Sequence, residues 1–321
     1  MSAWLWTMAA GSVAVFALYG LRCARAVRIP ALRESPWLTA LLAFVFSAVF
    51  GAVIARVSYA LMTQELDFEY DGIEALAQLL EFEYDRLSFF GGALGVFLGV
   101  LLANRLTRKG AVMNGMDAFA PFGALLVAVF RLGELFFGSY GAGRRLPEGN
   151  LFAFFPFSVE IKTAAGYSYW AWNICLLSAV FALAWAAFSF LKLRGGTRAG
   201  LNLTATFFFL ALPQVFCESL RGRGIRWLFV HTEELLCVVA LLVPLLIWII
   251  QVRGRLPFLR RWWPLGVLLL GAGLLVGVEF AIDGKYFSLS VNISYLIMLL
   301  VLAAIGFAGA FAAKRWNADK P

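Results

Sequence analysis

An arginine and a glutamate stand inside an apolar stretch of the chain, in the sequence FRLGELFFGSYG at residues 130–141. Arg131 and Glu134 are three residues apart, so on a helix they share one face and partly neutralise each other. A charge at membrane depth is costly, and it usually marks a functional site. We expect this pair to be such a site; the alternative is an intramembrane ion pair that only orients helices.

A second charged set lies in the sequence QVFCESLR at residues 214–221. Gln214, Glu218 and Arg221 follow one another at spacings of four and three, so all three face the same way on a helix. If two helices carry both sets at the same depth, two arginines and two carboxylates converge on one cavity. Arginine suits a phosphate ligand there, because its planar fork binds phosphate oxygens in pairs. Alternatively, Glu218 and Arg221 are interfacial residues that extend to water.

The composition places these residues in a membrane. The chain is 62% hydrophobic and 16% aromatic but only 14% charged, which is typical of an all-α, polytopic integral membrane protein. The net charge of +8 comes from basic residues clustered between apolar runs, so it indicates membrane topology and not a nucleic-acid partner. The four cysteines lie in or beside apolar runs and indicate neither a disulfide framework nor a metal site. No cofactor is expected.

About nine apolar segments approach the roughly 20 residues needed to cross a bilayer. The first is expected to be a retained helix and not a cleaved signal peptide, because no basic residues precede it. Of the 27 Lys and Arg residues, 17 fall in one alternating set of loops and 8 in the other. This asymmetry predicts an N-terminus outside and a C-terminus in the cytoplasm. The expected spans are 3–21, 37–63, 88–104, 117–138, 169–191, 201–219, 227–250, 264–282 and 288–312.

Two loops on the outer side are unusual. Residues 64–86 carry eight acidic residues around the run IEALAQLL, which predicts either an interfacial surface helix or a solvated connector. The sequence LRGRGIR at 220–226 concentrates Arg221, Arg223 and Arg226 on the side that should be poor in positive charge. An anionic lipid phosphate is the expected partner of these arginines.

These residues resemble the prolipoprotein diacylglyceryl transferase family, bacterial membrane enzymes that move diacylglycerol from phosphatidylglycerol to the lipobox cysteine of a prolipoprotein. The resemblance runs in order along about residues 1–250. The matching positions are Tyr19 and Gly20 in the YG of the first helix, Gly91 and Gly92 in S-x-H-G-G, Asp117 in Asp-x-x-x-Pro, Arg131 and Gly133 in G-R-x-G-N, and Glu218 and Arg221 in R-x-x-x-E-x-x-R.

Three positions depart from the family pattern. Phe90 stands in place of a histidine, Glu134 in place of an asparagine and Gln214 in place of an arginine. The last two spans lie beyond the seven helices typical of the family. The resemblance therefore implies a divergent member, with a transferase-like domain at 1–250 followed by a linker and helical hairpin at 251–321. A non-catalytic lipid-binding or lipid-transport protein on the same scaffold is the alternative.

The resemblance also implies partners, and together with the charged residues themselves it gives candidate roles; for Glu134, which departs from the family pattern, these are proton acceptor or simple ion-pair partner of Arg131. The partners are phosphatidylglycerol, the prolipoprotein signal peptide with its lipobox, and membrane lipids, at the bacterial plasma membrane. The catalytic candidates are Arg131, Glu134, Glu218 and Arg221, and the substrate-binding candidates are Tyr19, Gly91, Gly92, Asp117, Gly133, Gly141, Gln214 and Arg223.

Several candidates have simpler structural interpretations. Tyr19 can be a packing aromatic, Asp117 a helix N-cap, and Gly91 and Gly92 sites of close helix packing. His231, the only histidine, is expected to be structural or interfacial. An aromatic belt at the entry of the fifth span is predicted from Tyr167, Tyr169, Trp170 and Trp172.

Overall fold

The computed structural model describes residues 2–318 apart from 27–28, 64–85, 109, 137–141, 148, 164–165, 193–196, 222–225, 228–229, 253–256 and 283–289. The chain forms two compact units. Unit 1 comprises Met1–Gly141 with Ile225–Trp227, and unit 2 comprises Ala142–Gly224 with Leu228–Pro321. The acidic segment expected to form a surface helix lies outside the described residues.

Nine helices among the described residues are long and apolar enough to cross a membrane, which confirms the predicted all-α, polytopic class. Most of their ends lie within a few residues of the expected spans. The helices are α1 (Ser2–Ala24), α2 (Pro36–Thr63), α4 (Phe89–Thr107), α5 (Val112–Glu134), α6 (Ile174–Lys192), α7 (Leu201–Leu220), α8 (Thr232–Gln251), α9 (Phe258–Ile282) and α10 (Val291–Ala318).

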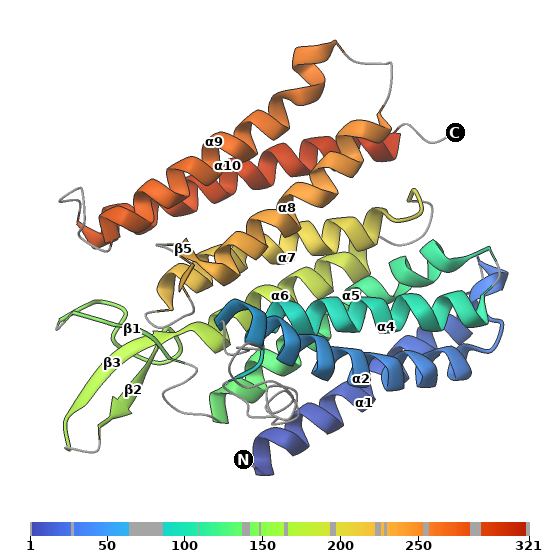
Figure 1. Ribbon diagram of the computed structural model, residues 1–321, viewed down its shortest axis with the longest axis horizontal. Coiled ribbons are helices and arrows are strands. Elements are labelled where there is room, and N and C mark those ends of the chain that lie inside the picture. The colour runs from blue at the N-terminus through green and yellow to red at the C-terminus, as the bar shows by residue number, and fades with distance from the viewer. Residues whose placement is uncertain are drawn as a thin grey trace, which may run out of the picture. The chain divides into compact units, whose positions relative to one another are not determined.

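Unit 1 consists of α1, α2, α4 and α5, with the short 3-10 turn η1 (Pro30–Leu32) between α1 and α2. Helix α2 lies along α4, and α1 contacts both α2 and α5 (Figure 1). The α2–α4 interface depends on small residues: a Cβ atom at Gly91 would come within 2.7 Å of the Ile54 carbonyl oxygen, and one at Gly95 would collide with the Phe50 carbonyl oxygen. Close packing is therefore the structural role of these glycines.

Unit 2 holds α6 to α10. Helix α7 contacts α6, α8 and α10, while α9 lies along α10 (Figure 1). Helix α10 is fixed to the others by specific contacts: the Phe208 ring lies against Gly309, and the Trp316 indole nitrogen donates to Gln251 Oε1 at 2.8 Å. The C-terminal helical hairpin is thus joined to α7 and α8 within this unit. The domain division expected at residue 250 stays a prediction.

A three-stranded antiparallel sheet in unit 2 was not expected from the sequence. It comprises β1 (Ala142–Arg145), β2 (Ser158–Lys162) and β3 (Ser168–Asn173) in the order β1-β3-β2. The expected fifth span was therefore wrong at its start, because residues 169–173 form a strand and the helix begins only at Ile174. Aromatic residues favour strands when cross-strand neighbours are available, and Trp172 pairs with Ser158 on β2. Two short strands, β4 (Arg226–Trp227) and β5 (Val230–His231), precede α8.

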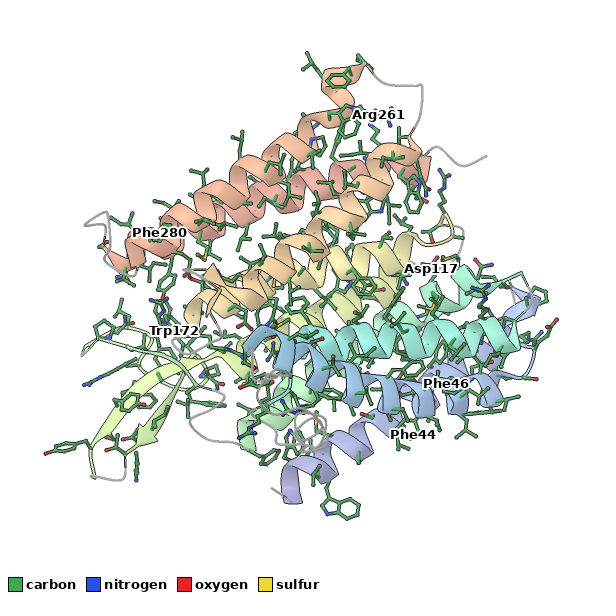
Figure 2. The ribbon with its side chains drawn as sticks, in the orientation of Figure 1. Phe44, Phe46, Asp117, Trp172, Arg261 and Phe280 are labelled. Atoms are coloured by element: carbon green, nitrogen blue, oxygen red, sulfur yellow. The ribbon has the colours of Figure 1, made fainter. Side chains whose placement is uncertain are left out.

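The outer faces of the helices are apolar. Carbon-rich side chains project from them along their length (Figure 2), and Leu270 on α9 and Phe307 on α10 are among the most exposed. A water-soluble protein rarely exposes apolar area on this scale. Lipid is the solvent that such helices require.

The α2–α4 interface gives a stability prediction. Gly95→Ala should lower the stability of the protein by about 1–3 kcal/mol, because the added methyl group meets backbone that cannot move aside. Gly92→Ala is the matched control, since a Cβ there would lie an ordinary 3.7 Å from Ala55. Thermal unfolding of both variants in detergent measures the difference. Equal melting temperatures would show that the interface is not closely packed at Gly95.

Candidate functional site

The Arg131–Glu134 pair closes the last turn of α5 in unit 1. Arg131 is fully buried, and its Nη1 atom donates to both carboxylate oxygens of Glu134 at 2.9 Å. The Glu134 side chain is only 16% exposed. The predicted sharing of one helix face is confirmed. A buried ion pair with this geometry holds the guanidinium in one orientation.

An aromatic ring from another helix also contacts Arg131. The guanidinium carbon lies 4.0 Å from the centroid of the Phe89 ring, which is a close cation–π contact. Phe89 is the first residue of α4, and Ser88 caps this helix by accepting from the Gly91 amide at 3.2 Å. Phe90 packs edge to face on Phe89 with centroids 5.7 Å apart. The start of α4 therefore positions the ring that covers Arg131.

The glycines near this pair serve close packing. A Cβ atom at Gly133 would lie 2.9 Å from the Met8 sulfur and 3.2 Å from Trp4 Cδ1, so α1 approaches α5 directly beside Arg131. Gly91 is equally confined, whereas Gly92 has ordinary space around it. Gly91 and Gly133 thus set the distances between helices at this site.

Tyr19 belongs to a different polar cluster at the other end of unit 1. Its hydroxyl donates towards Asn104 Oδ1 at 3.1 Å and the Gly115 carbonyl at 3.3 Å, and Arg108 Nη1 donates to Asn104 Oδ1 at 2.7 Å. All these groups are buried. Gly115 and Arg131 are separated along α5 by about 24 Å, at 1.5 Å per residue. Tyr19 therefore does not lie beside Arg131.

Asn104 and Arg108 were not among the sequence candidates, because Arg108 is one of the 17 basic residues that the topology count places in loops. In the structure it is one of the largest fully buried side chains. The available signal was the spacing of four between the two residues, which places them on one face of a helix. The N-cap interpretation of Asp117 was wrong: α5 begins five residues earlier, at Val112 after the N-cap Ala111, and Asp117 lies within the helix (Figure 2).

The second charged set has the predicted common face. Gln214 Nε2 donates to Glu218 Oε1 at 2.6 Å, and the Arg221 Nε atom lies 3.4 Å from Glu218 Oε2. Ser178 on α6 donates to Gln214 Oε1 at 3.0 Å. Gln214 and Glu218 are buried, while Arg221 at the end of α7 is partly exposed. The set is thus an ordered network in unit 2.

Three further charged residues surround this network and were not among the sequence candidates. Arg144 on β1 lies 3.9 Å from Glu279 on α9. Glu234, near the start of α8, is buried and interacts electrostatically with Glu218, Glu279 and Arg144. Glu279 stands within the last-but-one apolar span, where an acidic residue is itself a signal of function. Unit 2 therefore gathers ionisable side chains from β1, α7, α8 and α9.

Some candidates remain untested. Gly141, Arg223 and the side chain of His231 lie outside the described residues. Arg131 and Glu134 belong to unit 1, whereas Glu218 and Arg221 belong to unit 2. Their convergence on one cavity stays a prediction. Among the described residues, no group of three or more His, Cys, Asp or Glu side chains has the arrangement that could hold a metal ion.

Comparison with known proteins gives one family. A family model described as prolipoprotein diacylglyceryl transferase matches residues 6–250. The match begins within α1 and ends within α8, so it contains both charged sets while α9 and α10 lie beyond it. No curated protein matches the chain.

The Tyr19 cluster gives a prediction that separates a structural role from a substrate role. Tyr19→Phe should destabilise the protein by about 1–3 kcal/mol, because it leaves buried polar groups without their partner. Tyr167→Phe, at a largely exposed position just before β3, is the control and should not change the melting temperature. Unchanged stability of Tyr19→Phe combined with lost activity would instead indicate that the hydroxyl contacts substrate.

Proposed function

The chain belongs to the prolipoprotein diacylglyceryl transferase family, and on that premise we propose that it transfers diacylglycerol from phosphatidylglycerol to the lipobox cysteine of a prolipoprotein. The transfer would take place at the outer leaflet of a bacterial plasma membrane. The observation that carries the proposal is the buried Arg131, held by Glu134 and Phe89 inside the matched region. A fixed, permanently charged guanidinium suits an anionic lipid headgroup.

The reaction defines what the site must do. A C–S bond forms between the cysteine thiol and the glycerol carbon of the lipid, and the C–O bond to phosphate breaks. The thiol proton passes to a base, and glycerol phosphate leaves with the bonding electrons. The protein must therefore bind the phosphate, stabilise the charge that develops on it, and accept one proton.

Arg131 is the proposed phosphate clamp. Its guanidinium geometry allows paired contacts with phosphate oxygens, and its burial strengthens each electrostatic interaction. Arg221 is the second candidate, because it is partly exposed beside the buried Glu218. Phosphate binding at Arg131 competes with Glu134 for Nη1. We propose that the displaced carboxylate then accepts the thiol proton.

A non-catalytic lipid-binding or lipid-transport role on the same scaffold is the second candidate. It is favoured by Phe90, Glu134 and Gln214, which replace the histidine, asparagine and arginine of the family pattern. A direct assay separates the two functions. Purified protein, labelled phosphatidylglycerol and a lipobox peptide should yield a peptide carrying the label through a thioether. Lipid binding without transfer, by protein shown to be folded, would support the second function.

Arg131→Lys tests the clamp. Lysine keeps the positive charge but loses the planar fork, so transfer should fall about 10²- to 10³-fold, the cost of removing one preorganised donor in other enzymes. Arg145→Lys on β1, an exposed position, is the matched control and should retain activity. Full activity of Arg131→Lys would contradict a mechanism centred on this guanidinium.

Glu134→Asn tests the proton acceptor by introducing the family's residue. If Glu134 is the base, transfer should fall by about 10²- to 10⁴-fold, the usual contribution of general-base catalysis. Glu160→Gln on the exposed face of β2 controls for the loss of one carboxylate. Transfer at the unmodified rate would limit Glu134 to orienting Arg131, and the base would have to be sought elsewhere.

A further inference from the structure

The segment between β1 and β2 exposes large apolar side chains. Its sequence at residues 151–157 is LFAFFPF, and Leu151 and Phe155 are 87% and 71% exposed. Phe152 and Phe154 are nearly half exposed. A contiguous apolar surface of this kind is uncommon where a protein faces only water.

Hydrogen bonds fix the segment in this conformation. Asn150 Oδ1 accepts from the Phe152 amide at 2.9 Å. The buried Ser158 hydroxyl donates to the Phe152 carbonyl at 2.8 Å, and the Phe154 carbonyl lies 3.3 Å from the same oxygen. The exposure of the apolar side chains is therefore a property of an ordered turn.

The segment lies where the chain enters a membrane span. The Asn173 amide donates to the Phe157 carbonyl at 2.8 Å, and Asn173 is followed directly by Ile174, the first residue of the span formed by α6. Trp172 lies at this junction of the sheet with α6 (Figure 2). Strand β3 thus continues into α6 without a linker, and the turn is hydrogen-bonded next to the first residue of α6.

Aromatic contacts extend from the turn to a second span. The Phe152 and Trp172 rings have centroids 5.6 Å apart, and Trp172 contacts Tyr295 near the start of α10 with centroids 6.5 Å apart. Aromatic side chains are enriched at the boundary between lipid and water. The other end of the β2–β3 hairpin, at the Lys162–Ser168 pair, lies about 13 Å further along the strands, at about 3.3 Å per residue.

We propose that the turn at residues 151–155 inserts its apolar side chains into the bilayer at the boundary where α6 begins. The occupant of this surface is lipid. The argument for lipid is continuity, because the turn adjoins two membrane spans and presents the residue types that bilayer interfaces favour. Glu160 and Lys162 on β2 are exposed, and charged side chains favour water. Only the end of the sheet next to the turn would therefore contact the membrane. The contact does not depend on the transferase reaction.

Nitroxide labelling in vesicles tests the proposal. Phe155→Cys, labelled and reconstituted in vesicles of phosphatidylglycerol and phosphatidylethanolamine, should be accessible to oxygen and shielded from a water-soluble nickel complex. Its oxygen-to-nickel accessibility ratio should be several-fold higher than that of labelled Tyr167→Cys, since acyl chains concentrate oxygen and exclude the complex. Tyr167 is the matched control: it was predicted to join an aromatic belt, but β3 separates it from the start of α6, and it is 76% exposed at the far end of the hairpin. The four native cysteines are buried.

Two results would overturn the proposal. Equal ratios at the two positions would show that the turn faces water. Shielding of the label at residue 155 from both reagents would show that protein, such as a second copy of the chain, covers this surface. Leu151→Cys supplies an independent reporter if Phe155→Cys does not fold. No prolipoprotein is present, so the result stands whether or not the transferase assay succeeds.

Discussion

The burial of a permanent positive charge in a membrane protein is the constraint on which unit 1 depends. Arg131 cannot lose its proton, so the surrounding helices must supply compensation. Glu134 provides a carboxylate at 2.9 Å and Phe89 an aromatic face at 4.0 Å. Glu134 lies on the same helix as Arg131, and Phe89 comes from α4. Beside them, Gly133 lets α1 approach α5 and Gly91 lets α2 approach α4.

Unit 2 faces a related constraint, because it buries acidic side chains where unit 1 buries an arginine. Glu218, Glu234 and Glu279 are buried acidic side chains from three helices. Gln214 and Arg221 contact Glu218, and Arg144 lies 3.9 Å from Glu279 and interacts with Glu234. Buried charges of one sign destabilise a fold unless the structure pairs them. Arg144 acts from the sheet, so β1 contributes to the electrostatics of the helices as well as to strand pairing.

Sequence reasoning located the helices because length and apolar composition alone decide whether a segment crosses a bilayer. Local spacing likewise found the two pairs, Arg131 with Glu134 and Glu218 with Arg221. Contacts distant in sequence were not accessible: the Phe89 ring over Arg131 and the Tyr19 hydroxyl on Asn104 depend on how helices pack. The strand at 168–173 was read as a helix because an aromatic, apolar run has no decisive period. Pairing with β2 makes residues 168–173 a strand.

The helical hairpin of α9 and α10, which lies beyond the family match, is not an independent addition to the fold. Glu279 contacts Arg144 and Phe208 packs against Gly309, so α9 and α10 share side-chain contacts with the part of the protein that the family model matches. A hairpin joined only by its linker could be gained or lost by a single recombination event without harm. This one contacts residues on β1 and α7. Replacing the hairpin by another would therefore require side chains that fit Arg144 and Phe208.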